Sequence, residues 1–146
     1  MIEILVAATI LSLFVIGILA VLNSSDTTWN IDMGLVQLQQ QTRGAMARTV
    51  REIRQADSVI SASGTTITFS TPWATSGNIV YSLVSGQIIR TYNSSTSVLG
   101  NNINSLSFSH SSGVVEIQIQ AQKSVRGRTI TFPMTGNLVE KVRLRN

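Results

Sequence analysis

The N-terminal part of the chain is a long run of apolar residues. From Ile4 to Leu22 there are 19 consecutive residues without a charge. As an α-helix this run would extend about 28 Å, close to the roughly 30 Å hydrocarbon core of a bilayer. The pattern therefore predicts a membrane-spanning helix. A secretory signal peptide would need a basic flank, where this chain has Glu3. A buried core helix would need a protein or assembly large enough to surround it.

A polar segment and then an amphipathic pattern follow the apolar run. The segment 23–28 reads Asn-Ser-Ser-Asp-Thr-Thr. Such side chains compete for backbone hydrogen bonds, so the segment predicts either a break in the helix or a second N-cap. From Trp29 to Ala56 apolar residues recur at helical spacing, which predicts an amphipathic helix. These residues are Ile31, Leu35, Leu38, Ala45, Val50, Ile53 and Ala56.

Beyond Asp57 the chain changes to short β-rich runs separated by Gly, Asn and Ser. Apolar and polar residues alternate from Val115 to Gln120, as in a half-exposed strand. Turn residues at Ser85-Gly86 and Ser111-Ser112-Gly113 favour hairpins and hence antiparallel pairing. The expected strands are Thr65–Ser70, Ile79–Leu83, Gln87–Tyr92, Ile103–Phe108, Val114–Gln122, Thr129–Met134 and Leu138–Leu144.

The patterns together predict an α+β fold in which one long N-terminal helix packs on a C-terminal antiparallel β-sheet. Three segments follow from this organisation. Residues 1–22 form the hydrophobic half of the helix, residues 23–57 form its amphipathic half, and residues 58–146 form the β domain. A chain of 146 residues is long enough for one such unit and too short for two full-sized cores.

The composition argues against catalysis. The chain has no Cys and one His, His110, in a serine-rich stretch that predicts a loop. No thiolate or imidazole set is therefore available for nucleophilic catalysis or zinc binding. Asp57 is the only acidic residue between Glu52 and Glu116, too few for a calcium loop. We expect a protein that is not an enzyme and that has no metal or cofactor.

Positive charge is confined to the later part of the chain. The net charge is +4, and no Lys or Arg precedes Arg43. Four arginines in the amphipathic segment fall within a sector of about 140°, as expected of a solvated charged face. A second group lies in the C-terminal quarter and predicts a basic contact patch. The helix arginines are Arg43, Arg48, Arg51 and Arg54, and the C-terminal group is Lys123, Arg126, Arg128, Lys141, Arg143 and Arg145.

The C-terminal basic residues raise the possibility of a nucleic-acid partner, because Lys and Arg contact phosphates. Trp73, Tyr81 and Tyr92 are candidates to stack on bases. The alternative is that acidic residues, Glu116 and Glu140, interrupt the patch and that the aromatic residues belong to the core or its rim.

Glu3 is the anomaly of the apolar run. A carboxylate near the end of an apolar helix is costly to bury without a partner. It could reach headgroup water at the bilayer surface. Inside an assembly it would need a positive partner, and no positive side chain lies nearby in the sequence. That partner would be an α-amino group, its own or that of a neighbouring chain.

The first residues resemble the N-terminal methylation segment of type IV pilins and type II secretion pseudopilins. The likeness lies in Ile2-Glu3-Ile4-Leu5-Val6-Ala7-Ala8, the apolar run, and the continuation into a Ser/Thr-rich β domain. Four later segments resemble PilW-like minor pilins and J-type minor pseudopilins. They are residues 79–83, 86–90, 103–108 and 142–146, of sequence IVYSL, GQIIR, INSLSF and VRLRN.

The resemblance implies a structural subunit of a helical filament, formed with copies of itself or other pilin-like subunits. It places Ile2, Glu3, Ile4 and Leu5 at the assembly surface, with Glu3 pairing with the N-terminal amine of an adjacent subunit. It implies a prepilin peptidase and an assembly platform as partners. The protein would enter the bacterial inner membrane and then a cell-surface or periplasm-spanning filament. The other role implied is a minor subunit that primes or tips the filament.

Three features depart from the family pattern. Only Met1 precedes Ile2, where the family pattern places a leader and two further mature residues. The apolar run has Ala20 and Val21 where many major pilins have a proline, and the C-terminal disulfide is impossible without Cys. These departures favour a minor or pseudopilin-type subunit.

Overall fold

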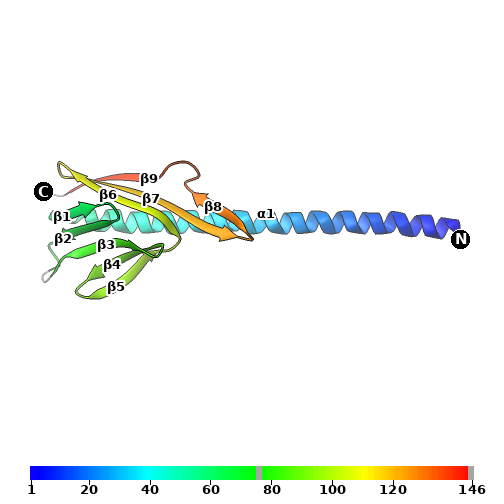
Figure 1. The fold of residues 1–146 in the computed structure, drawn as a ribbon, viewed down its shortest axis with the longest axis horizontal. Coiled ribbons are helices and arrows are strands. Elements are labelled where there is room, and N and C mark those ends of the chain that lie inside the picture. The colour runs from blue at the N-terminus through cyan, green and yellow to red at the C-terminus, as the bar shows by residue number, and fades with distance from the viewer. Residues whose placement is uncertain (75–76, 145–146) are drawn as a thin grey trace.

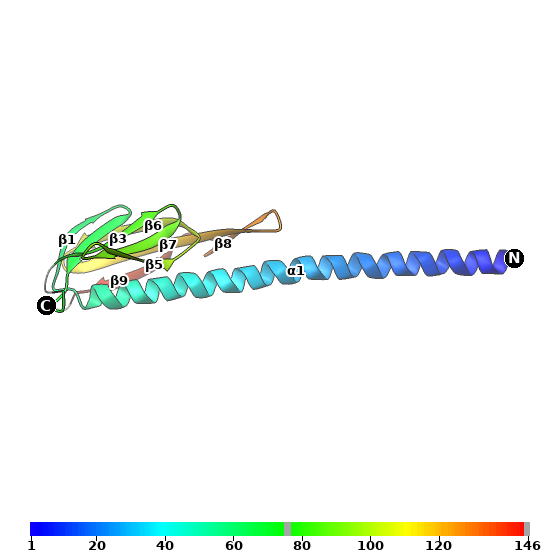
Figure 2. The ribbon, with the colours of Figure 1, turned by 90° about the horizontal axis from the view of Figure 1, so that it is seen from below.

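A computed structural model describes residues 1–74 and 77–144, and it confirms the α+β fold. One long helix runs along a layer of antiparallel strands that lie on one side of it (Figures 1 and 2). The elements are α1 (Ile2–Arg54), β1 (Ser58–Ser63), β2 (Thr66–Ser70), β3 (Ile79–Val84), β4 (Gln87–Tyr92), β5 (Ser95–Gly100), β6 (Ile103–Ser111), β7 (Val114–Val125), β8 (Arg128–Phe132) and β9 (Leu138–Arg143).

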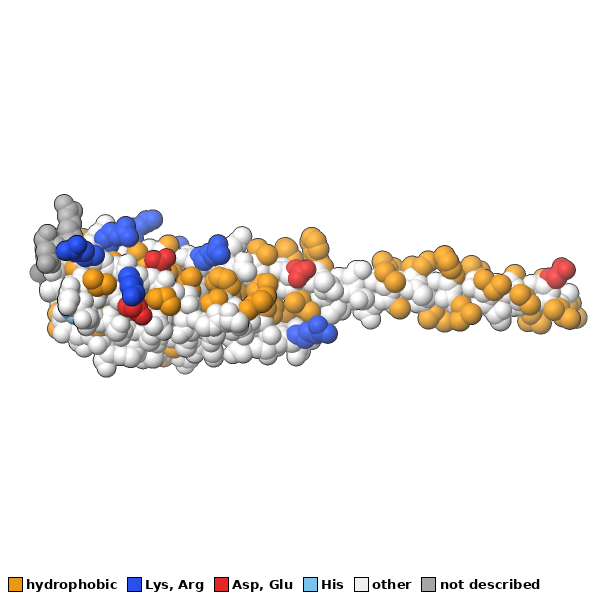
Figure 3. All heavy atoms as spheres, turned by 90° about the horizontal axis from the view of Figure 1, so that it is seen from above, with side chains coloured by type: hydrophobic (Ala, Val, Ile, Leu, Met, Phe, Trp, Pro, Cys, Tyr) orange, Lys and Arg blue, Asp and Glu red, His pale blue; other side chains and the backbone are white. Residues whose placement is uncertain are grey.

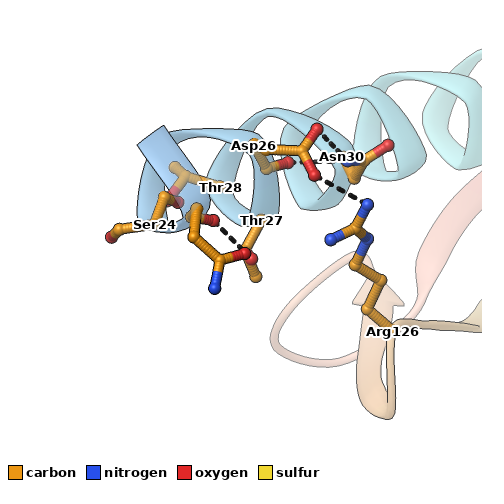
Figure 4. Close-up of polar contacts among 7 residues, drawn as sticks. Ser24, Asp26, Thr27, Thr28, Asn30 and Arg126 are labelled. Atoms are coloured by element: carbon orange, nitrogen blue, oxygen red, sulfur yellow. Dashed lines mark hydrogen bonds and ion pairs between the residues drawn. The ribbon is translucent and has the colours of Figure 1, made fainter. Parts of the chain in front are cut away.

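The helix α1 is continuous over 53 residues, about 80 Å. The expected break or second N-cap at residues 23–28 is wrong. The hydroxyls of Thr27 and Thr28 donate to the carbonyls four residues earlier, at 2.9 and 3.1 Å. The Asn30 amide donates to the carbonyl and the carboxylate of Asp26. These polar side chains are satisfied inside the helix, so they do not interrupt it (Figure 4).

The helix ends slightly before the expected amphipathic segment does. Arg54 is its last residue. The backbone N–H of Gln55 donates to the carbonyl of Glu52, and that of Ala56 donates to the carbonyl of Ile53, each at 3.0 Å. Ala56 lies beyond the helix and is still buried in the core. The chain then turns directly into β1 at Ser58.

The strands form two sheets rather than one. The first sheet has the order β1-β2-β3-β4-β5, and the second has the order β6-β7-β8. The strand β9 also pairs with β7, over the N-terminal part of β7, whereas β8 pairs with its C-terminal part. All seven strand pairs among the described residues are antiparallel. Two strands, β1 and β5, were not expected from the sequence. Their side chains are mostly exposed, so they lack the alternation that marked the other strands.

Tight turns set the register of the hairpins. Ser85-Gly86 and Ser112-Gly113 have positive φ at both residues, as type I′ turns require, and these two expected hairpins are confirmed. Ser111 is the last residue of β6 rather than part of the turn. Two further turns of this kind join β4 to β5 and β7 to β8, and they are Asn93-Ser94 and Arg126-Gly127.

The core lies between the C-terminal half of α1 and the strands. The helix packs against β5, β7, β8 and β9. From Val115 to Ala121 of β7 every second side chain is buried, as the alternation predicted, whereas no side chain of β7 is buried beyond Ala121. The buried apolar residues of the helix are Leu38, Ala45, Met46 and Ile53. This packing fastens the β domain to α1 over the span from Gly34 to Ile53.

Helix and strand approach each other closely at Gly100, the last residue of β5. A methyl group on Gly100 would lie 2.8 Å from the Ala45 Cβ. We expect Gly100→Ala to lower the free energy of unfolding by about 1–3 kcal/mol, because two packed elements would have to separate. Chemical denaturation of the full chain in detergent measures this change.

Ala45→Gly provides the matched control because it removes the atom that clashes. By itself it should cost about 1 kcal/mol of helix propensity. Combined with Gly100→Ala, it should cost less than the sum of the two single changes. Additive costs would contradict the proposed contact.

Candidate functional site

The N-terminal half of α1 projects away from the β domain and carries the largest exposed apolar surface (Figure 3). It is long and apolar enough to cross a membrane, and none of its apolar window is buried. Its side chains are apolar on all sides, so no face is reserved for the β domain. The large exposed residues are Ile2, Ile4, Leu5, Val6, Ile10, Leu11, Leu13, Phe14, Val15, Ile16, Ile18, Leu19, Val21 and Leu22. This surface is compatible with membrane anchoring.

Glu3 lies in the first turn of α1 and is exposed, as are Ile2, Ile4 and Leu5 beside it. A carboxylate there is favoured by the helix dipole. Within the described parts of the chain, no Lys or Arg forms an ion pair with Glu3. All four residues expected at an assembly surface are therefore exposed, and as consecutive helix residues they point to different sides of α1.

Where the helix leaves the β domain, the β7–β8 hairpin touches it. Arg126 stands in the turn of this hairpin, and its Nη2 lies 2.7 Å from Oδ2 of Asp26 (Figure 4). A second contact lies further along, where Lys123 Nζ donates to Oε1 of Gln37 at 3.4 Å. The hairpin thus marks the boundary between the free and the packed halves of α1.

The C-terminal basic residues do not come together as one patch. Lys123, Arg126 and Arg128 lie near the β7–β8 turn, whereas Lys141 and Arg143 lie on β9, opposite the other end of β7. On β7, Glu116 is paired with Lys141 and Val125 is paired with Arg128. These two β7 residues are nine positions apart, so the two basic groups are separated by roughly 30 Å along the strand. Arg145 lies outside the described residues.

Three of these basic residues already have protein partners. Arg126 pairs with Asp26, Lys123 bonds to Gln37, and Lys141 Nζ lies 3.3 Å from Oε2 of Glu116.

The aromatic candidates for base stacking are also engaged. Tyr81 is fully buried, and its ring stacks on Phe69 with centroids 5.6 Å apart. Trp73 contacts Tyr92 edge to face, and the guanidinium of Arg90 lies over both rings, at 5.9 and 5.6 Å. This cluster belongs to the domain's own structure.

A charged pair that the sequence did not indicate anchors the end of α1. Arg90 Nε on β4 lies 2.9 Å from Oε2 of Glu52, 38 residues away in the chain. Burial opposes the charge of Arg90, but the hydrogen bond and charge of Glu52 outweigh it and raise the pKa of Arg90. Burial, and then the charge of Glu52, raise the pKa of Tyr81 well above its ordinary value.

Glu116 offers a test of the electrostatics of the second sheet. Gln118 Nε2 donates to its Oε1 at 2.8 Å, and Lys141 adds a weaker contact. These two partners, Gln118 first, hold the pKa of Glu116 below its ordinary 4.5. Because the folded pKa is depressed, the stabilisation is present above the unfolded pKa and is lost as the pH falls through the folded pKa.

An NMR titration of the Glu116 side-chain carboxyl should therefore give a midpoint below 4.5. Gln118→Ala should move the midpoint upward more than Lys141→Met does, because the amide hydrogen bond is the larger cause. A midpoint that neither substitution changes would contradict this assignment.

His110 lies on a strand and not in the expected loop. It is the penultimate residue of β6 and pairs with Val115 of β7, with its side chain exposed. The described residues contain no group of three His, Cys, Asp or Glu side chains placed to hold a metal ion.

No family model matches the chain, and neither a curated protein nor a solved structure matches it.

Proposed function

We propose that the chain is a structural subunit of a pilin-like filament. Its N-terminal helical half inserts in the inner membrane and later packs with the same half of other subunits, while the β domain stays outside. Burial of apolar helices drives the assembly, and no chemical step is required. The partners are copies of this chain or other pilin-like subunits.

The observation that carries the proposal is the geometry of α1. One continuous helix joins a freely projecting, predominantly apolar half to a half that is fastened to a β domain. An exposed apolar surface of this size in water demands a partner, either lipid or protein. The single carboxylate of Glu3 in the first turn favours protein, because an assembled helix bundle can offer it a positive partner.

Electron microscopy of sheared cell-surface material tests the proposal, with mass spectrometry to count this chain against other pilin-like subunits. A filament built almost wholly of this chain would make it the major subunit. Trace presence in a filament built of other subunits would support the minor, priming or tip role. Absence from every filament would overturn the proposal and favour a monomeric membrane-anchored domain.

A contact with DNA by such a minor subunit rests on the C-terminal basic residues. Because these residues form two groups at opposite ends of β7, each would bind a phosphate backbone separately. Binding that falls steeply with salt would support this role. No binding at low salt would remove it.

A further inference from the structure

The solvent-facing side of α1 carries an acidic and apolar stripe just beyond the polar segment. The stripe consists of Trp29, Asp32, Met33 and Val36, which lie three to four residues apart on one helix face. Trp29 is 67% exposed, and Met33 and Val36 are each 46% exposed. Asp32 is exposed too and forms no ion pair with the described residues. Nothing in the described chain covers this stripe.

A basic groove lies further along the same helix, between α1 and β9. Its volume is about 580 Å³. Ala47, Val50 and Leu138 give it apolar walls, and Arg43, Arg51 and Arg54 surround these. Glu140 is the one acidic residue in the lining. None of the three arginines forms an ion pair within the described chain, although Arg43 lies over the Phe132 ring at 5.7 Å.

Each of three stripe residues has a groove residue 14 positions later in the sequence. The matched pairs are Trp29 with Arg43, Met33 with Ala47, and Val36 with Val50. Fourteen residues are nearly four helical turns, so each pair points in about the same direction, with an axial distance of about 21 Å. Figure 3 shows this face, with an acidic side chain among hydrophobic ones at mid-helix and basic side chains toward the C-terminal end of the helix.

We propose that the stripe of one copy docks in the basic groove of a second copy, which is displaced by about 21 Å along the helix axis and turned about that axis so that its groove faces the stripe. In this arrangement Asp32 lies between Arg43 and Arg51 of the other copy, and the apolar residues cover the groove walls. The charges are complementary, since three arginines and one glutamate line the groove. The inference rests on the proposed filament function.

The stripe that docks in a groove must belong to another molecule. Both surfaces lie on one continuous helix, so the stripe cannot fold back onto its own groove. Two copies resting level in a membrane would not align the stripe with the groove. The contact forms only when one copy is raised relative to the other, as in a filament whose subunits leave the membrane in succession.

The absence of Cys from the sequence makes a crosslinking test clean. In the full chain, Met33→Cys with Ala47→Cys cannot bond internally, because these positions are about 21 Å apart on the helix. After oxidation, or treatment with a short bis-maleimide, we expect covalent dimers and longer ladders in sheared filaments. The yield of these crosslinked species should be at least fivefold lower in the pool of protein that stays in the membrane.

A second variant, with Val36→Cys and Val50→Cys, should give the same crosslinked ladder. It tests the contact if the first variant does not assemble into filaments. Met33→Cys with Ser109→Cys is the matched control. Ser109 is exposed on β6 and is paired with Glu116, on the face of the sheet that points away from the core. This control should give no ladder.

The outcomes separate the contact from the proposed function. Filaments whose Cys pairs give no ladder would overturn the docking and leave the filament role in place. A chain that forms no filament at all, even without substitutions, would overturn both. Adding Asp32→Arg to the Cys pair should reduce the ladder about fivefold through charge repulsion, and an unchanged yield would overturn the role of Asp32.

Discussion

Glu3→Leu should leave membrane insertion intact and reduce filament yield at least tenfold. Insertion is unaffected because the substitution lengthens an already sufficient apolar run. Assembly suffers because the partner charge in the helix bundle loses its carboxylate, and breaking a buried ion pair costs several kcal/mol. Carbonate extraction of membranes measures insertion, and quantification of sheared filaments measures assembly.

Two substitutions show whether charge is the cause. Glu3→Gln keeps the shape of the side chain without its charge and should assemble as poorly as Glu3→Leu. Ile4→Leu alters the neighbouring residue conservatively and should assemble normally. Normal filament yield from Glu3→Leu would show that residue 3 only anchors the chain at the bilayer surface.

Phe69→Ala should lower the free energy of unfolding of the β domain by about 3–5 kcal/mol. Phe69 is fully buried on β2, belongs to the hydrophobic core and stacks on Tyr81, so its removal leaves a cavity in that core. Chemical denaturation in detergent, followed by near-ultraviolet circular dichroism, measures the change.

Phe14→Ala is the matched control, since it is the same substitution at a side chain that is 70% exposed on the projecting half of α1. It should leave the stability of the β domain within about 0.5 kcal/mol of the parent value. Equal losses from both substitutions would mean that the two halves of the chain unfold as one unit.

The sequence predicts well those elements in which the pattern of apolar and polar residues reflects the environment of the side chains. The apolar run and the helical spacing from Trp29 onward predict α1, and the alternation after Val115 predicts β7. The strands β1 and β5 escape prediction because backbone pairing, and not side-chain burial, holds them in the sheet. The polar segment misleads because its side chains bond within the helix as readily as they would cap it.

The candidate site shows a similar division. Glu3 stands out in the sequence because the apolar residues that surround it on the helix are also its neighbours in the sequence. The C-terminal basic group looks compact in the sequence, but β7 is 12 residues long and separates its members in space. The pair of Glu52 with Arg90 joins positions 38 residues apart, so only the folded structure reveals it.

The attachment of the β domain along α1 has a mechanical consequence. The buried helix residues from Gly34 to Ile53 span about 29 Å parallel to the helix axis. Tension applied through the projecting half pulls along this interface, so all its contacts share the load at once. A pull across the interface would instead detach them one after another. A filament built in this way should resist stretching far better than lateral prying of its outer domains.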